Sequence, residues 1–138
     1  RTGSFVTSVD MRQTDAPEYG DGYGLWIGPP ELGKYYDFFV STNTTFAALG
    51  SYGITYYNSS TTMGMAHGTS NAINMNNGVN MLKVYRCGTR YYFYANGTLL
   101  TSLVLTELAN QALTTGFYAR TMHNGTFRLD NFHIQAAP

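Results

Sequence analysis

Charged side chains are scarce in this chain of 138 residues, and its only lysines are Lys34 and Lys83. Charged residues make up 12% of the sequence, against roughly a quarter of an average domain, and the formal net charge is zero. Proteins that bind nucleic acid or an anionic membrane surface present a basic face. The composition therefore predicts no nucleic-acid partner.

Cysteine and long apolar runs are equally rare. Cys87 is the only cysteine, so no disulfide can form within the chain, and we expect it to be a small residue at a strand end. No stretch approaches the roughly 20 apolar residues of a transmembrane helix, so we expect no membrane span. The sequence starts at Arg1 rather than at methionine, which favours a processed product.

Asparagine, threonine, serine and tyrosine are abundant instead, which favours interactions through hydrogen bonds and aromatic stacking. Four Asn-x-Ser/Thr sequons, the acceptor motif for N-glycosylation, occur at Asn43, Asn58, Asn96 and Asn124. All four fall at expected turns or loops, where a glycan can be accepted, although Asn96 and Asn124 are equally explained as Asn-Gly turns. We therefore expect an extracellular or cell-surface protein.

Residues 79–105 carry the clearest structural signal. Apolar and polar residues alternate from Val79 to Arg86, Gly88 interrupts the run, and four aromatic residues follow at positions 91–94. A period of two is typical of a half-buried strand, and aromatic residues favour a pleated surface. Asn96-Gly97 then predicts a tight hairpin turn, because a type I′ turn needs positive φ at both central positions.

The remaining sequence reads as further short strands joined by Gly- and Asn-rich turns. We expect strands at residues 4–12, 22–28, 35–41, 45–49, 52–57, 62–65, 115–122 and 126–135, with a single helical turn at 107–112 and otherwise loop between 58 and 78. No helix is long enough for a βαβ crossover. The sequence predicts an all-β fold, an antiparallel two-sheet β-sandwich formed by one domain over residues 1–138.

Particular segments carry a resemblance to a known fold. They are AINMNNGVNMLKVYRCGTRYYFYANGTLL and LTTGFYARTMHNGTFRLDNFHI in the second half, and SFVTSVDMR, GDGYGLWIG and YYDFFVST in the first. Together they resemble a concanavalin A-like jelly roll of the laminin G and 3-keto-disaccharide hydrolase-like kind. These motifs specify a fold more than an activity. Domains of this kind usually begin with a further strand, so the resemblance implies either a trimmed domain or an open sheet edge.

Catalytic groups are few. Glycoside hydrolysis needs two carboxylates placed across the scissile bond, and hydrolytic relatives of this fold carry a Glu-x-Asp-x-x-Glu strand that is missing here. Asp15 and Glu18 flank Pro17, which favours a solvated loop. The three histidines have neither a Gly-x-Ser-x-Gly context nor zinc-ligand spacing. We therefore expect no enzymatic activity.

A structural calcium ion is the one cofactor that the resemblance suggests. In related sandwiches an acidic residue of the closing strand, here Asp130, helps to hold Ca²⁺ together with loop oxygens, and Asp10 or Asp21 is a candidate partner. Calcium needs about six to eight oxygen ligands. The alternative, which we favour, is that Asp130 caps a turn or pairs with Arg128 or Arg120.

Aromatic residues provide the candidate binding surface, because sugars stack their apolar faces on aromatic rings. The candidates for carbohydrate binding are Trp26, Tyr35, Tyr36, Tyr56 and Tyr57, with Asn43 and Asn58 in adjoining loops. Each ring is also explained as a core residue or a cross-strand pair. Trp26 is the strongest candidate, since its face also carries Gly24 and Gly28.

The sequence thus supports two functions. The first is a non-catalytic extracellular β-sandwich for recognition or adhesion, whose partner is a glycan or a cell-surface protein. The second is a structural subunit of a self-assembling surface filament, a homo-oligomer joined through sheet edges or strand exchange, which zero net charge and long aromatic β-runs would suit.

Overall fold

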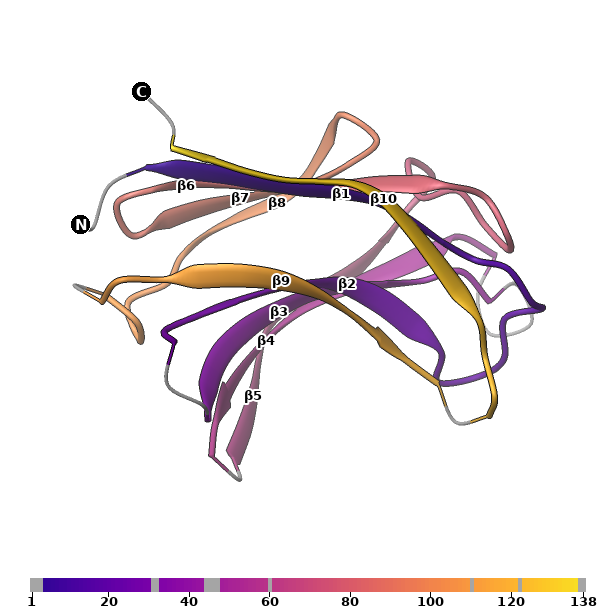
Figure 1. The fold of residues 1–138 in the computed structure, drawn as a ribbon, viewed down its shortest axis with the longest axis horizontal. Coiled ribbons are helices and arrows are strands. Elements are labelled where there is room, and N and C mark those ends of the chain that lie inside the picture. The colour runs from indigo at the N-terminus through magenta and orange to yellow at the C-terminus, as the bar shows by residue number, and fades with distance from the viewer. Residues whose placement is uncertain are drawn as a thin grey trace.

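Two antiparallel sheets face each other across an apolar core (Figure 1). The computed structural model describes residues 4–30, 33–43, 48–59, 61–109, 111–121 and 123–136. The first sheet has the strand order β10-β1-β6-β7-β8, and the second has the order β5-β4-β3-β2-β9. Within each sheet, every pair of neighbouring strands is antiparallel. The predicted all-β two-sheet sandwich is confirmed.

The strand bounds follow the predicted pattern over most of the chain. The first sheet contains β1 Phe5–Gln13, β6 Asn80–Cys87, β7 Arg90–Ala95, β8 Thr98–Val104 and β10 Phe127–Ala136. The second contains β2 Gly22–Gly28, β3 Lys34–Ser41, β4 Gly50–Asn58, β5 Thr61–Ser70 and β9 Thr114–Arg120. Cys87 ends β6 and is exposed, in agreement with the prediction.

Alternation along each strand decides which side chains form the core. In β3, Tyr36, Phe38 and Val40 are buried between the sheets, whereas the residues between them point to the outer face. Phe38 meets Phe93 of the first sheet edge to face, with ring centroids 5.3 Å apart. Such pairs contribute about 0.5–1.5 kcal/mol beyond the apolar area that they bury. The core therefore fixes the orientation of the outer face as well.

The Asn96-Gly97 turn joins β7 to β8 as predicted. Both residues have positive φ, 53° and 82°, which is the conformation that a type I′ turn demands. The Asn96 side chain extends the turn's role, because its Oδ1 accepts a hydrogen bond from the Met81 amide at 2.9 Å. The hairpin is thus tied to the preceding strand β6.

The last strand departs from strict alternation. The register between β1 and β10 shifts by one residue between Ser8 and Asp10, and Asn131 has a φ of 53°. An extra residue in one strand moves every later side chain to the opposite face. Phe127 and Phe132 therefore both pack against the core, although strict alternation would place residues five positions apart on opposite faces.

The stretch after β4 also differs from the expectation. A short strand was expected at residues 62–65, but β5 spans ten residues and pairs with β4 along its length. Its small residues have low β-propensity, so pairing with β4 overrides the local preference. The expected strand at 45–49 lies mainly outside the described residues, and Ala48 and Leu49 form a bend. Of the expected helical turn at 107–112, residues 107–109 form a hydrogen-bonded turn in which the Ala109 amide donates to the Thr106 carbonyl, and residue 110 lies outside the described residues.

The second sheet is curved. Figure 1 shows β2, β3 and β9 with ends bent away from the other sheet, so the outer face of this sheet is its hollow side. Within the described residues, no helix has the length and hydropathy needed to cross a membrane.

Candidate functional site

The outer face of the second sheet brings together side chains from four neighbouring strands. Trp26 in the middle of β2 lies opposite Asp37 of β3 on one side and opposite Gly116 of β9 on the other. Tyr35 of β3 lies opposite Tyr57 of β4. Side chains two residues apart on a strand share a face, so these residues form one continuous surface.

Two glycines let large rings lie flat on this surface. A Cβ atom added at Gly116 would lie 2.4 Å from the indole nitrogen of Trp26, so the indole occupies the space that a side chain would fill. Similarly, a Cβ added at Gly53 would lie 2.5 Å from the ring of Phe39. The rings pack on backbone, which holds them in fixed orientations and leaves Trp26 partly exposed.

A pocket of about 380 Å³ opens beside the Trp26 ring. This volume falls within the roughly 300–1,000 Å³ that is usual for small-molecule sites. Tyr35 and Tyr57 are stacked on one side, with ring centroids 4.7 Å apart and planes 21° from parallel. The described lining residues are Trp26, Pro29, Pro30, Gly33, Lys34, Tyr35, Asp37, Tyr57, Tyr118 and Arg120.

Asp37 is the only carboxylate among these described lining residues. Its side chain is buried, and its Oδ1 atom has no hydrogen-bond partner. Burial raises the pKa of Asp37 to about 6, although the Tyr118 hydroxyl, the Arg120 guanidinium and the Tyr57 hydroxyl oppose that rise. The carboxylate thus sits in a weakly solvated place where its charge is only partly compensated.

Asp37 in turn affects the pKa of the tyrosines around it. Burial raises the pKa of Tyr118 and of Tyr57, and the negative charge of Asp37 raises both further. These phenols therefore stay protonated at neutral pH. The Arg120 guanidinium lies 5.2 Å from the centroid of the Phe39 ring, a cation–π contact that holds it at the edge of the pocket.

Trp26, Tyr35 and Tyr57 are thus brought together as neighbours, but Tyr36 is not. The prediction of Tyr36 as a sugar-binding residue is wrong, because it is 1% exposed and points into the core. Its hydroxyl donates to Glu107 Oε1 at 3.1 Å and accepts from the Leu108 amide. Tyr56 is buried beside it, with ring centroids 5.3 Å apart. Each of these tyrosines is one residue from an outer-face tyrosine, and one residue reverses the face.

Sequence reasoning named only Trp26, Tyr35 and Tyr57 among the described lining residues and missed the others, including Asp37, Tyr118 and Arg120. The alternation in β3 did place Asp37 on the same face as Tyr35, so that signal was available. Tyr118 and Arg120 come from β9, which pairs with β2 although about 90 residues separate them. No local pattern in the sequence announces that pairing.

The predicted sequons have different outcomes. Asn43 is 5% exposed, so the prediction of a glycosylation site there is wrong for the folded protein. The side-chain nitrogen of Asn96, Nδ2, donates to the Ala72 carbonyl and to Asn80 Oδ1, both at 2.8 Å. A glycan on that nitrogen would break these bonds. Asn58 and Asn124 are exposed, and glycosylation at these two stays a prediction.

The residues near Asp130 do not fit a calcium ion. Asp10 is its register partner, but Asp130 Oδ1 accepts from the Asn131 amide at 2.8 Å and Asp10 Oδ2 accepts from the Asn131 side chain at 2.8 Å. Asp21 belongs to another cluster, described below. Among the described residues, no three His, Cys, Asp or Glu side chains gather as metal ligands would.

Comparisons with known proteins agree on the fold. No model of a protein family matches the sequence, and no curated protein matches it. A carbohydrate-binding module of Bacillus subtilis, CBM66, matches the structure with a TM-score of 0.68 at 14% identity, covering 97% of this chain and 76% of the module. The chain has a concanavalin A-like jelly-roll fold.

Other solved jelly rolls of this class include binding proteins and enzymes. A structure of botulinum neurotoxin type C, whose cell entry depends on interaction with two ganglioside molecules, matches with a TM-score of 0.62 at 16% identity, over 99% of this chain but 33% of the toxin chain. An alginate lyase of Pseudomonas aeruginosa matches with a TM-score of 0.59 at 9% identity, over 99% of this chain and 66% of the enzyme. At these identities the likeness establishes the fold alone.

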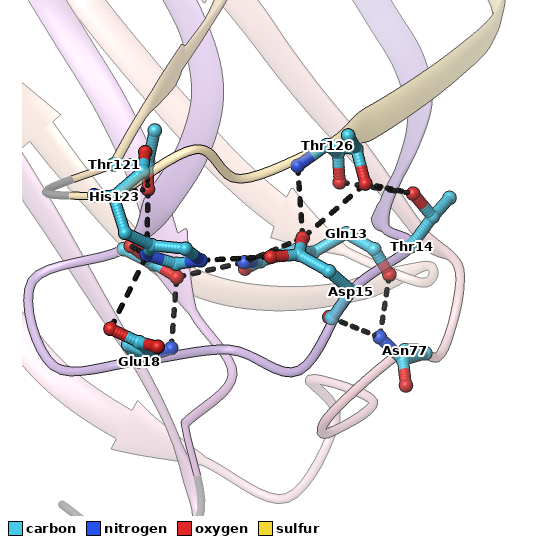
Figure 2. Close-up of polar contacts among 9 residues, drawn as sticks. Gln13, Thr14, Asp15, Glu18, Asn77, Thr121, His123 and Thr126 are labelled. Carbon is cyan, nitrogen blue, oxygen red and sulfur yellow. Dashed lines mark hydrogen bonds and ion pairs between the residues drawn. The ribbon is translucent and has the colours of Figure 1, made fainter.

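A second polar cluster lies at the end of the jelly roll where β1 leads into β2 and β9 leads into β10 (Figure 2). His123 Nε2 lies 2.8 Å from Asp15 Oδ2, while its Nδ1 lies 3.5 Å from Glu18 Oε2 and from Asp21 Oδ1. Hydrogen bonding to Asp15 and the charges of Asp21 and Glu18 raise the pKa of His123. Bonds from the Thr126 amide and from His123 lower the pKa of Asp15.

This cluster resembles a hydroxyl–histidine–carboxylate triad only in its distances. Thr121 Oγ1 lies 3.0 Å from His123 Nδ1, but the same oxygen bonds the amide and the carbonyl of His123, which is the pattern of a local turn. Asp15 Oδ1 accepts from the Thr126 amide, and Asp21 Oδ2 accepts from Gln13 and from the Glu18 amide. These contacts give the cluster a structural role, joining two loops that are distant in the sequence.

Proposed function

We propose that this chain is a non-catalytic carbohydrate-binding domain whose ligand lies in the pocket on the hollow face of the second sheet. The observation that carries the proposal is Trp26, held flat over Gly116 beside the stacked pair Tyr35 and Tyr57. The carbohydrate-binding module among the structural neighbours makes a glycan a reasonable ligand for this fold. The chemistry of the pocket supports it independently.

Sugar rings have an apolar face and a polar edge, and the pocket offers partners for both. The C–H groups of a pyranose pack well on a rigid aromatic ring, and the hydroxyl groups at its edge need hydrogen-bond partners. Trp26 and the tyrosine stack provide the rings. Asp37, Tyr118 and Arg120 provide charged and polar groups in the same pocket. Because the rings are packed on backbone or on each other, little side-chain entropy is lost on binding.

Substitution of Trp26 tests the proposal. We expect Trp26→Ala to weaken binding to glycans selected on an array at least about tenfold, because a central aromatic side chain usually dominates such a site. Titration calorimetry measures the affinity, and circular dichroism checks the fold. Tyr92→Ala is the matched control, since Tyr92 lies on the outer face of the other sheet. Equal affinity of Trp26→Ala and wild type, or no binding to any glycan, would overturn the proposal.

The non-catalytic part of the proposal rests on the lack of a second acidic group. Glycosidases place two carboxyl groups across the scissile bond, whereas Asp37 stands alone among the described lining residues. We expect no release of reducing ends or of unsaturated products from any glycan that binds. Turnover abolished by Asp37→Asn would contradict this.

The location and the narrower relationship belong to the same proposal. We place the protein outside the cell or on its surface, with the exposed sequons Asn58 and Asn124 as its glycan acceptors. Within the concanavalin A-like class, we assign it to the laminin G and 3-keto-disaccharide hydrolase-like domains by its sequence motifs.

A specific feature of the second sheet favours self-assembly as the alternative function. Strand β5 forms an edge of this sheet and contains neither proline nor a charged Asp, Glu, Lys or Arg side chain in its ten residues. Such residues normally protect an edge strand from pairing with another chain. Size-exclusion chromatography and negative-stain microscopy decide between the two functions. Polymers that survive dilution would favour the filament subunit.

A further inference from the structure

One carboxylate oxygen of the pocket residue Asp37 lacks a hydrogen-bond donor. Asp37 is 5% exposed, and its Oδ1 atom has no partner although the residue lines the pocket. A buried acceptor without a donor is unfavourable, so a ligand that brings a donor to this atom gains free energy. The position of Oδ1 therefore favours ligands that carry O–H or N–H groups.

The phenols around Asp37 strengthen this selection. The hydroxyls of Tyr118 and Tyr57 lie near the Asp37 carboxylate and lower its pKa. A phenol oxygen has lone pairs with which to accept a hydrogen bond. Towards a ligand, these hydroxyls can therefore accept hydrogen bonds, as Asp37 Oδ1 does. A sugar with adjacent hydroxyl groups supplies several donors in one place.

The positive groups of the pocket do not reverse this preference. Arg120 stacks on Phe39, and its charge is already engaged in partly compensating the charge of Asp37. Lys34 is exposed at the rim. A ligand carboxylate or sulfate at the floor would bring a second negative charge close to Asp37 and would offer it no donor.

We infer, on the basis of the proposed function, that the pocket takes a neutral sugar that directs adjacent hydroxyl groups at Asp37, and that it discriminates against sugars bearing a carboxylate or a sulfate. Asp37 is then a specificity-determining residue rather than a catalytic one. The chemical class of ligand is a neutral oligosaccharide.

Binding of this kind depends on the ionisation of Asp37. The ionised carboxylate is the better acceptor, and burial raises its pKa to about 6. The groups that face it are Tyr118 and Arg120 of β9, Tyr57 of β4 and Tyr35 of its own strand, and each of the three phenols has a raised pKa. Asp37 is therefore the group that titrates near pH 6 in the pocket. Affinity is full above about pH 7 and falls about tenfold at about pH 5.

The test compares matched ligands at two pH values. Galactose oligomers and galacturonic acid oligomers of the same length are titrated calorimetrically at about pH 7.5 and about pH 5, with glucose, mannose and fructose oligomers added to the neutral panel. We expect wild type to prefer neutral oligomers and to lose about tenfold affinity at the lower pH. Asp37→Asn should bind neutral oligomers at least about tenfold more weakly at the higher pH and lose the pH dependence.

Two control variants isolate the role of Asp37. Asp130→Asn makes the same chemical change at an exposed site on β10, and His123→Gln removes a histidine outside the pocket whose pKa is raised. Both should keep the wild-type preference and pH profile. Asp37→Asn is nearly isosteric, and its fold is checked by circular dichroism.

The outcomes separate this inference from the proposed function. A preference for the acidic oligomer, or a flat pH profile of wild type, would overturn the ligand class even if Trp26→Ala abolishes binding. No binding of any oligomer, or undiminished binding by Trp26→Ala, would overturn both. If Asp37→Asn does not fold, the wild-type preference and pH profile still decide.

Discussion

At the scale of single residues, the site depends on two glycines, Gly53 and Gly116, whose lack of a side chain leaves room for a ring. Trp26 and Phe39 lie over glycines of neighbouring strands, and both glycines are hidden beneath a ring. Large rings that cover strand glycines compensate for the weak strand propensity of glycine, because the ring shields the bare backbone. The same packing orients Trp26 for its proposed ligand.

A methyl group at Gly116 should therefore impair binding without altering the pocket's chemistry. A Cβ there would lie 2.4 Å from the Trp26 indole nitrogen, so the indole must tilt. We expect Gly116→Ala to reduce glycan affinity about three- to tenfold, which corresponds to roughly 1 kcal/mol. Trp fluorescence reports the displaced ring. Gly64→Ala is the matched control, since nothing lies within 4 Å of a Cβ at that strand glycine. An unchanged affinity of Gly116→Ala would contradict the assigned role of the ring orientation.

At the scale of elements, polar side chains decide how the strands are joined. Asn80 is fully buried in β6. Its Nδ2 donates to the Tyr23 hydroxyl and to the Asn74 carbonyl, and its Oδ1 accepts from the Asn74 backbone amide and from the side-chain Nδ2 of Asn96. Because every hydrogen-bonding group of Asn80 is satisfied, a buried amide is tolerated in the core. The β7–β8 hairpin, the loop before β6 and the second sheet are thus held at one point.

Removing the Asn96 side chain should expose the importance of this junction. Asn96→Ala loses bonds to Met81, Ala72 and Asn80 and places alanine at a φ of 53°. We expect a loss of roughly 2 kcal/mol in the free energy of unfolding, measured by chemical denaturation. Asn124→Ala, in the other Asn-Gly turn, is the control and should change stability by less than about 0.5 kcal/mol. Equal effects of the two substitutions would show that the junction is unimportant.

Some features of these elements follow from the local sequence pattern, whereas others arise only from the pairing of distant strands. The alternation in Asn80–Cys87 and the Asn-Gly turn are properties of neighbouring residues, so both were predictable. The bulge in β10 arises from its register with β1, and β5 is a strand because β4 lies beside it. In the site, alternation placed Asp37 on the face of Tyr35. The prediction nevertheless included both members of each adjacent tyrosine pair, although Tyr36 and Tyr56 belong to the core. Arg120 depended on the non-local pairing of β9 with β2.

At the scale of the whole molecule, the cluster around His123 ties the ends of both sheets together. Asp15 follows β1, His123 precedes β10, and 108 residues separate them. Asn77 extends the cluster to a third segment by donating to the Gln13 and Asp15 carbonyls (Figure 2). Bringing together segments so distant in the sequence costs loop-closure entropy, which the contacts of the cluster help to offset.

The cluster predicts a particular dependence of stability on pH. The pKa of His123 is raised in the folded state, so its contribution is full below the unfolded value of 6.5 and is lost as pH rises through the folded value. The pKa of Asp15 is lowered, so its contribution is present above the unfolded value of 3.8 and is lost as pH falls towards the folded value. The contribution of the pair is therefore greatest between these two unfolded values.

Thermal unfolding at about pH 5.5 and about pH 8.5 measures the histidine's part. We expect the melting temperature of wild type to fall more between these values than that of His123→Gln. His133→Gln serves as control, because His133 is exposed on β10. An identical difference in wild type and His123→Gln would mean that this histidine does not stabilise the fold.

The glycines beneath the rings, Gly53 and Gly116, also limit which positions of this domain can be changed by engineering. A library that randomises every residue of the hollow face would fill Gly53 and Gly116 with side chains that collide with Phe39 and Trp26. Most members of such a library would lose the shape of the pocket before they gained a new specificity. Diversity is better confined to Tyr35, Tyr57 and the rim residue Lys34, where a new side chain meets solvent or a ligand instead of the sheet.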